Sequence, residues 1–511
     1  MNRTLFALFA GLVLAATGRA DGALPAPKPP EEIRLSLREC VFLALNHNID
    51  IEISRYQPWI DDQSLRSAFG VFDHVLYADA SGGRNRLAAR DVLVGVPVLS
   101  TEDALFRTGL RRTIPAGLTY DLSVVVEREE TNSSFATVDP FWQQSVGLSV
   151  TVPVLRGAGE EVNTTPIVLA RNARRISVAD FEKLLADTVL AVQEAYWTLV
   201  SALEVKKFRE QALESARRLL EDNRLRERRG ILAKVDVTEA EAGVASQVEG
   251  ILTADNAVQD AMDRLKRLVD PALLRGEAQI VPLDAPGVPS GELDERQAVE
   301  TGLRDAMERR TEYRAIFVEL ESRERELARS RNEAQPKLTA VASGQVLGAE
   351  DDFSSSTREF RGGDTYSWSL GVALEIPLEN RSGDGAVRRA ELDRRRLILR
   401  RRALEDTILV EVREAAREIK TTERRIEATA RARVLAQERF DGEESRRDLG
   451  LRTTFHVLDA RSKLTEAQSN EVKSRVDHAS AWARYRRATG TLLSHHDILV
   501  DSNLAPRQAA R

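Results

Sequence analysis

Two very long helical stretches, each followed by a similar eleven-residue string, constrain this chain more than any other feature. The strings are GILAKVDVTEA, at Gly230 to Ala240, and GLRTTFHVLDA, at Gly450 to Ala460, and they begin 220 residues apart. A repeat of this kind sets the architecture into which every other motif must fit. The sequence therefore predicts an internal tandem duplication.

Both helical stretches carry apolar residues at heptad spacing, which is typical of helices that pair along their length. At 1.5 Å per residue, each stretch would be on the order of 100 Å long. The first stretch covers about 163–229, and its seam is Val189, Val192, Tyr196, Leu199 and Leu203. The second covers about 385–449, and its seam is Leu404, Ile408, Val412, Ala415, Ile419 and Ile426.

Shorter helical runs complete the pattern. Return helices are predicted at 238–269 and 457–493, and further helical runs at about 36–68 and 295–333. One return helix and one such run, stacked end to end, equal one long helix. Four helical columns of similar height follow from this count.

The predicted domain limits follow from the same pattern. The first repeat spans 35–270 and the second spans 295–493, with a C-terminal tail at 494–511. A proline- and glycine-containing connector at 271–294 separates the repeats in the equatorial region, because such residues favour turns over helix.

Segments of alternating apolar and polar residues indicate β-strands at about 75–153 and 338–377. An additional hairpin is expected in the first half, turning near 114–117. In the clearest strands the polar face carries Ser145, Ser149, Ser367 and Ser369, and aromatic residues stand at the upstream end: Phe141, Trp142, Tyr366 and Trp368. The common explanation for such alternation is a strand that packs one face on the core of a soluble domain and exposes the other to water. Strands capped by aromatics are typical of outer-membrane barrels, where these four would meet the lipid interface.

Composition and the N-terminus indicate an exported protein. Residues 1–20 resemble a secretory signal peptide, with Arg3 before an apolar run, and a proline-rich linker follows at 21–34. Removal of Arg3 and Arg19 would change the formal net charge from -6 to -8, which argues against nucleic-acid binding. The single cysteine, Cys40, is expected to be a small buried hydrophobic residue.

This arrangement resembles the outer-membrane efflux protein family, the TolC-like channel-tunnels, over about Leu35 to Leu493. The resemblance is carried by LSLRECVFLALNHNIDI at Leu35 to Ile51, by VPVLRGAGEEVN at Val152 to Asn163, by IPLENRSGDGAVRRA at Ile376 to Ala390, and by the second string. It implies a mainly α fold with β, in which long antiparallel helical hairpins form an α-barrel. It also implies a homotrimer whose transmembrane strands form one shared 12-stranded β-barrel in the cell outer membrane.

The resemblance further implies a function. The protein would be a passive exit duct of a tripartite efflux or type I secretion system, with its tunnel projecting into the periplasm. A periplasmic adaptor and an inner-membrane pump would engage its tip, and the pump would supply the energy.

The two strings fall where helical columns turn back, and Gly230 and Gly450 suit helix C-termini there. In the resembled family, an arginine of the second string binds an aspartate of the first and helps to close the tip, while two acidic residues ring the aperture. By position the arginine is Arg452, its partner is Asp236, and one aperture acid is Asp459. The alternative is that these are solvated charges at helix ends.

Two positions depart from the family pattern. The other aperture acid is replaced by His456, and a tyrosine of the closing network corresponds to Arg447. Histidines remove negative charge at neutral pH and gain positive charge below about pH 6.5. We therefore expect weaker block by cations and greater pH sensitivity than an all-acidic ring would give.

An enzyme and a soluble scaffold are the two rival classes of protein. No Walker loop, nucleophile elbow or metal-ligand spacing is present, so the sequence indicates neither an enzyme nor a cofactor or metal site. The stronger rival is a soluble periplasmic coiled-coil adaptor or scaffold. Such a protein would have no reason to repeat aromatic-capped strands.

Overall fold

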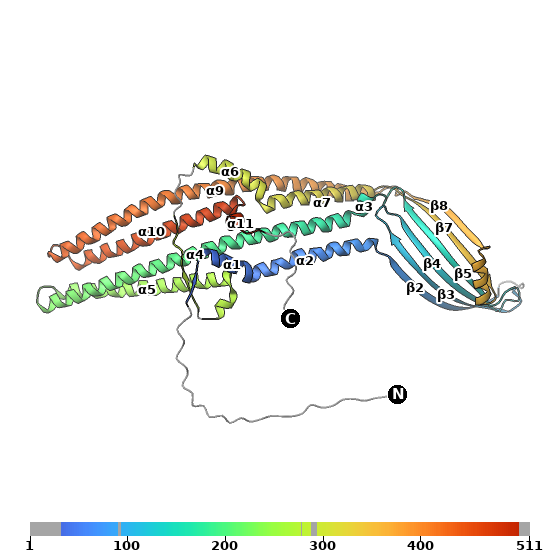
Figure 1. Cartoon of the computed structure of the whole chain (residues 1–511), viewed down its shortest axis with the longest axis horizontal. Coiled ribbons are helices and arrows are strands. Elements are labelled where there is room, and N and C mark those ends of the chain that lie inside the picture. Colours follow the sequence, from blue (N-terminus) through green and yellow to red (C-terminus); the bar gives the residue numbers. More distant parts are fainter. Residues whose placement is uncertain (1–31, 90–93, 277, 288–293, 500–511) are drawn as a thin grey trace, which may run out of the picture.

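The chain folds into an elongated bundle of helices. A six-stranded sheet lies at one end, and at the other end two turns each connect a pair of antiparallel helices (Figure 1). The computed structural model describes residues 32–89, 94–276, 278–287 and 294–499. The predicted signal peptide at 1–20 lies outside the described residues, as do most of the linker at 21–34 and most of the tail at 494–511.

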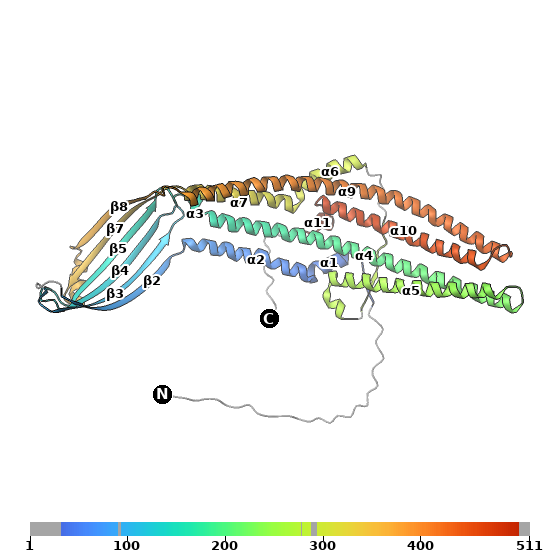
Figure 2. The same ribbon diagram turned by 180° about the vertical axis from the view of Figure 1, so that it is seen from behind.

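Four helical columns run side by side, as the sequence predicts. Two are single long helices, and each of the other two is a pair stacked end to end: α5 continues the line of α2, and α10 continues the line of α7 (Figures 1 and 2). The bounds are α4, Thr165–Arg228; α9, Arg381–Asp448; α2, Ile49–Phe69; α5, Lys234–Val269; α7, Thr311–Glu333; and α10, Thr454–Ala488. The fold is thus mainly α, with the internal repeat that the two strings indicated.

The heptad seams form the contacts between the columns. On α4, Val192, Tyr196 and Leu199 are 0 % exposed, and on α9 the same is true of Ile408 and Val412. Burying one such side chain contributes about 1.5–3 kcal/mol, so a few turns of seam hold each helix to its neighbours.

Two runs that the sequence presents as continuous helices are each broken once. The first is divided into α1, Leu37–His47, and α2 at Asn48, whose side chain accepts a hydrogen bond from the amide of Ile51 and so caps α2. The second is divided into α6, Glu295–Arg309, and α7 at Arg310, whose backbone is extended. Each break lies at the start of the sheet-side helix of a stacked column, α2 in one column and α7 in the other.

The return helices also differ from their predicted limits. They begin earlier, at Lys234 and Thr454, and α10 ends at Ala488 rather than near 493. Gly490, with φ +73°, ends α10, and the short helix α11, Leu492–His495, follows. Glycine adopts this left-handed conformation without the steric cost that other residues incur.

A small parallel sheet packs against the helices near the middle of the bundle. Strand β1, Glu32–Leu35, pairs with β6, Gln279–Pro282, so the predicted linker and the predicted non-helical connector each contain a strand. The 3-10 helix η3, Pro271–Arg275, precedes β6. This sheet packs on the largest buried cluster, which includes Tyr196 and Cys40. Cys40 is fully buried, as expected.

The large sheet is antiparallel, in the order β2-β3-β4-β5-β7-β8. Its strands are β2, Val75–Ala88; β3, Val98–Thr113; β4, Thr119–Thr131; β5, Phe141–Pro153; β7, Lys337–Glu350; and β8, Tyr366–Glu375. The short elements η1, Gly70–Phe72, and α3, Glu160–Asn163, join it to the helices. The additional hairpin predicted in the first half is β3–β4.

One helix inside the predicted strand region was not foreseen. Helix α8, Phe353–Gly362, lies between β7 and β8. Its sequence is rich in serine, which gives little helical signal, but Asp352 caps its start by accepting from the amides of Ser354 and Ser355. Gly363, with φ +71°, ends it.

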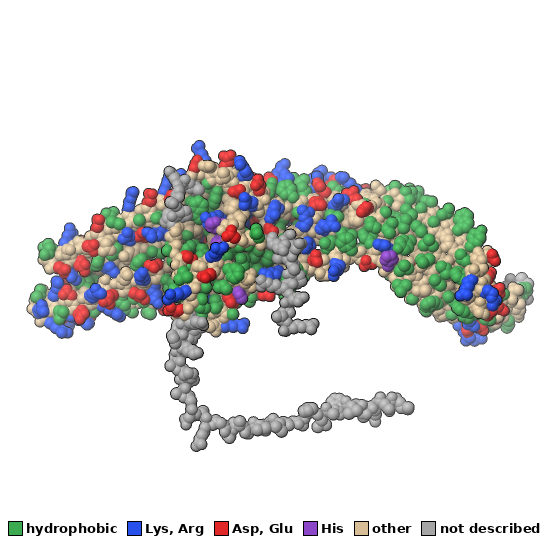
Figure 3. All heavy atoms as spheres, in the orientation of Figure 1, with side chains coloured by type: hydrophobic (Ala, Val, Ile, Leu, Met, Phe, Trp, Pro, Cys, Tyr) green, Lys and Arg blue, Asp and Glu red, His purple; other side chains and the backbone are tan. Residues whose placement is uncertain are grey.

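The register gives the sheet an apolar and a polar face. Residues opposite one another in neighbouring strands point to the same side, and the register pairs odd with odd and even with even throughout. The even face carries most of the aliphatic side chains, for example Leu122, Val146 and Leu370. The odd face carries small and polar residues such as Ser149 and Ser369. In the space-filling view, hydrophobic side chains gather over the sheet, and charged ones over the helices and at the far end of the sheet (Figure 3).

Candidate gate and channel wall

The two strings form matching turns at the end of the molecule opposite the sheet (Figure 1). Gly230 and Gly450 follow α4 and α9 with φ values of +75° and +73°. Behind them, the amide of Ile231 donates to the carbonyl of Arg226 over 2.9 Å, and Leu451 donates to Arg446 over 2.9 Å. Each of these hydrogen bonds runs from an amide to the carbonyl five residues earlier, as in a Schellman motif, and pairs a carbonyl that the helix end would otherwise leave without a partner.

An ion cluster joins the two hairpins near these turns. Arg226 and Asp222 of α4 lie beside Arg447 and Asp448 of α9, with 3.4 Å between Arg226 and Asp448 and 3.7 Å between Arg447 and Asp222. Arg447 also contacts its neighbour Asp448. Hydrogen bonding from Arg447 holds the pKa of Asp448 below its usual value.

Arg447 is the one residue of this cluster that the sequence analysis assigns to the gate. Its side chain is 13 % exposed, so the contact with Asp222 is better shielded from solvent than a typical surface pair. The sequence offers no signal for Asp222, Arg226 and Asp448 beyond ordinary helix-end charge.

A buried amide adds a second link between the strings. Asn223 of α4 is 2 % exposed, and its side chain donates to the hydroxyl of Thr454 over 2.8 Å and to the backbone carbonyl of Asp236 over 3.2 Å. Because a buried polar group that loses its partner costs about 1–3 kcal/mol, these bonds favour one arrangement of the two tips.

The other predicted gate residues have partners within their own hairpin. Arg452 lies 3.4 Å from Glu443 and 3.5 Å from the imidazole of His456, and Asp459 pairs with Arg439 at 2.8 Å. Among the described residues, no ion pair joins Arg452 to Asp236. The predicted contact between those two residues stays a prediction.

A groove of about 510 Å³ lies between the hairpins, beside the ion cluster. Leu219, Phe440 and Val457 contribute its apolar lining, and they belong to a buried cluster at the tip. Arg461 also lines the groove, with its guanidinium carbon 5.2 Å from the centre of the Phe440 ring. The Nε of Arg461 is buried with no hydrogen-bond acceptor, and burial lowers the pKa of this side chain.

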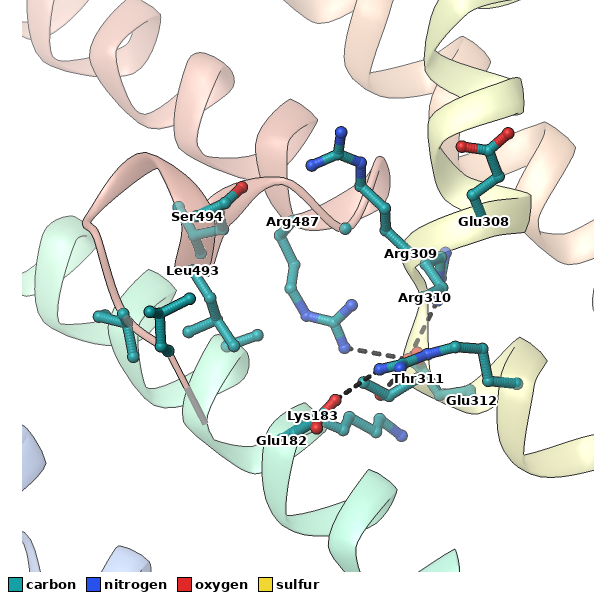
Figure 4. A pocket seen from close by; sticks show the side chains of 16 residues that line it. Glu182, Lys183, Glu308, Arg309, Arg310, Thr311, Glu312, Arg487, Leu493 and Ser494 are labelled. Carbon is teal, nitrogen blue, oxygen red and sulfur yellow. Dashed lines mark hydrogen bonds and ion pairs between the residues drawn. The ribbon is translucent and has the colours of Figure 1, made fainter. Parts of the chain in front are cut away.

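A second ion cluster holds the stacked helices together at mid-height (Figure 4). Glu312, in the first turn of α7, accepts from Arg310 over 3.2 Å and from Arg487 of α10 over 3.1 Å. Burial opposes ionisation, but backbone hydrogen bonding and the two arginines outweigh it, and the pKa of Glu312 is lowered to about 2. Arg310 and Arg487 also reach Glu411 of α9 and Asp187 of α4. The joint between α7 and α10 therefore also contacts the two long helices, α9 and α4.

The sheet separates the four predicted interface aromatics. Trp142, Tyr366 and Trp368 are even-numbered and lie on the apolar face, whereas Phe141 is odd-numbered and lies on the polar face. Phe141 lies on the opposite face from the other three because successive side chains of a strand alternate, and a position of these four residues at the lipid interface stays a prediction. Trp142 packs against Phe353 of α8, with 5.7 Å between ring centres, while the other two are exposed.

Residues 32–89, 94–276, 278–287 and 294–499 contain neither a metal-ligand cluster nor a membrane-spanning helix. No group of three or more His, Cys, Asp or Glu side chains there is placed to hold a metal ion. No helix in those ranges has both the length and the apolar character needed to cross a membrane.

Comparison with known proteins identifies the family. The family model described as "Outer membrane efflux protein" matches residues 119–269 and 302–491. Outer membrane protein TolC of Escherichia coli strain K12 is 21 % identical over 345 residues, which is 66 % of this chain and 68 % of TolC. The chain belongs to the outer membrane efflux protein family.

Solved structures show the same fold. The channel OprN has a TM-score of 0.65 at 15 % identity, covering 89 % of this chain and 90 % of that one. CmeC of Campylobacter jejuni has a TM-score of 0.63 at 16 % identity, with 89 % and 86 % covered. VceC of Vibrio cholerae has a TM-score of 0.64 at 15 % identity, with 89 % and 96 % covered.

Family membership places the chain in the outer membrane, with its helices as a periplasmic tunnel, and sets aside the soluble adaptor alternative. The family consists of channels, which are not enzymes.

Proposed function

We propose that three copies of this chain form the passive exit duct of a tripartite efflux or type I secretion assembly. A periplasmic adaptor would bind the tip, and an inner-membrane pump would deliver the substrate and supply the energy. The apolar face of the shared sheet would meet outer-membrane lipid.

The open sheet carries this proposal. Its edge strands β2 and β8 have no partner on their outer sides within the described sheet, and all ten residues of β8 are exposed. An unpaired strand edge cannot face lipid, because its backbone groups would have no hydrogen-bond partners there. Closure with neighbouring copies satisfies both edges, and the polar face then lines a water-filled lumen.

Assembly and conduction can be tested on purified protein. Light scattering in detergent should give the mass of three chains, and insertion into a planar bilayer should give discrete conductance steps. A stable monomer, or a trimer that never conducts, would reject the duct.

The ion cluster at the tip supports a gate inside each protomer. Replacing Arg447 by alanine removes its contact with Asp222, so the two hairpins should separate more readily and the open-channel current should rise. Arg446→Ala is the matched control, since Arg446 pairs with Glu443 of its own helix. Equal currents in the two variants would contradict a gating role.

The groove between the hairpins supports an adaptor site. Its apolar lining would accept an apolar side chain of the adaptor, and Arg461, whose Nε has no acceptor, would accept an acidic one. A photo-crosslinking residue at Leu219, in the groove, should capture a periplasmic helical-hairpin protein in the source cells. The same residue at Leu399, exposed on the sheet-side half of α9, is the control, and equal capture at both would refute the site.

A further inference from the structure

The hairpin β3–β4 is a full part of the sheet. It lies between β2 and β5, and β3 pairs with β2 along the whole of Val75–Ala88 and with β4 along the whole of Thr119–Thr131. Three copies of this six-stranded sheet contain 18 strands, not the 12 that the family resemblance implies.

Contacts at the base of the hairpin hold it to the helices. Its turn, 114–118, meets the junction between β5 and α3, where the amide of Gly159 donates to the carbonyl of Ala116 over 3.2 Å. Gly117 has φ +95°, and a Cβ there would lie 2.5 Å from the carbonyl oxygen of Gly157. On the other side, Arg112 donates to the carbonyl of Phe72 over 2.9 Å. The hairpin therefore spans the sheet from the helical end outward.

Both faces of the hairpin match the rest of the sheet. Phe106, Leu122 and Val124 continue the apolar face, and each is at least 39 % exposed in the single chain. Strands of about 13 residues rise about 30 Å at a tilt of about 40°, enough to cross the apolar part of a membrane.

Resting on the trimer proposed above, we propose that β3–β4 widens the shared barrel to 18 strands, so that the membrane part of the duct passes cargo as bulky as the helical tunnel admits. Strands about 4.8 Å apart, tilted by about 40°, give each chain an arc of about 38 Å with six strands and about 25 Å with four. Four helical columns, about 8–10 Å apart, need about 32–40 Å. Six strands thus match the columns below them.

The width sets the class of cargo. The backbone diameter is about 36 Å for 18 strands and about 24 Å for 12, and side chains reduce these to about 26 and 14 Å. Since a helix with side chains is about 10–12 Å wide, the wider lumen admits two helices side by side and the narrower only one. Bulky polypeptides and large solutes fit the wider duct.

The hairpin also adds charge to the polar face. Asp121 of β4 accepts from Arg111 of β3 over 2.8 Å and from the hydroxyl of Tyr77 over 2.8 Å. All three residues are odd-numbered and therefore face the lumen in the 18-stranded barrel. Neighbouring positions in the same rows carry serine or glycine, such as Ser149 and Gly147.

The first experiment compares the full chain with a variant lacking residues 98–131, in which β2 and β5 become neighbours. Neutral polymers of graded size are added to the barrel side of a bilayer, and the size that no longer enters the pore is measured. We expect the cut-off diameter to fall by about half in the variant, with both proteins trimeric by light scattering. Equal cut-offs, or a wild-type particle of only two chains, would overturn the 18-stranded wall.

A second measurement applies even if the deletion variant does not assemble. Asp121→Asn leaves Arg111 without its anionic partner in each copy, so anion permeability should rise relative to cation permeability. Glu102→Gln, in the same hairpin but on the apolar face, is the control and should change nothing. Unchanged selectivity in Asp121→Asn would overturn the lumenal placement. Absence of any conducting trimer in the wild type would instead reject the proposed function.

Discussion

Glu312 provides a quantitative test of how the stacked columns are joined. Its carboxylate lies between Arg310 and Arg487, and its pKa is about 2 in the folded chain instead of the ordinary 4.5. Since each pKa unit corresponds to about 1.4 kcal/mol, the joint favours the charged form by about 3 kcal/mol at neutral pH. The Glu312→Gln variant should lose most of this stabilisation, because an amide carries no charge to attract the two arginines.

The loss should be local. Hydrogen exchange at the start of α7 and the end of α10 should become about 100-fold faster at pH 7, which is the factor that corresponds to about 3 kcal/mol of easier opening. Glu308→Gln is the control, because Glu308 is exposed on α6. Equal exchange rates in the two variants would refute the role of Glu312.

The pH dependence gives a second check. The unfolded chain takes up a proton near pH 4.5, but the folded chain resists until about pH 2, so the stabilisation is complete above pH 4.5 and is lost as pH falls through that window. The difference in urea unfolding free energy between wild type and Glu312→Gln should shrink from about 3 kcal/mol at pH 7 to about 1 kcal/mol near pH 2.5. A difference that stays constant would show that the effect is not electrostatic.

Three further predictions concern other parts of the chain. Tyr196→Phe removes a buried hydroxyl that bonds the backbone at β1 and beyond β6, and should lower the urea unfolding free energy by about 1–3 kcal/mol, whereas the exposed Tyr56→Phe should not. Gly117→Ala should reduce the yield of trimers on gel filtration, because its Cβ would lie 2.5 Å from a backbone oxygen, whereas Gly371→Ala, with nothing near, should assemble normally. His456→Asp should strengthen the block of single-channel current by divalent cations at neutral pH, and the block should then depend less on pH than in the wild type. Identical block in the wild type and the variant from pH 5 to 8 would contradict an aperture role.

The parts of the fold set by local pattern could be predicted from the sequence. Heptad spacing indicated the long helices, because residues at that spacing share one helix face. Gly230 and Gly450 marked the turns, because their backbone conformation favours glycine. Strand alternation likewise placed Ser149 and Leu148 on opposite faces of the sheet.

The breaks and pairings could not be predicted in this way. Asn48 and Arg310 interrupt helical patterns at places that only the stacked columns explain. Helix α8 lies in a serine-rich segment and packs on β7 and β5 through contacts distant in sequence, such as the bonds from Gln144 to Ser356 and Thr357. Local propensity carries no information about such partners.

By itself, the sequence determined the duplication, the four columns, the two turns and the two faces of the strands, because each depends on spacing within one segment. The tertiary structure decided which charges meet, placing Arg447 against Asp222 of the other hairpin and Arg452 against Glu443 of its own. It also decided that six strands share one sheet. These outcomes depend on the register between segments up to hundreds of residues apart, and that register is set only when the columns pack.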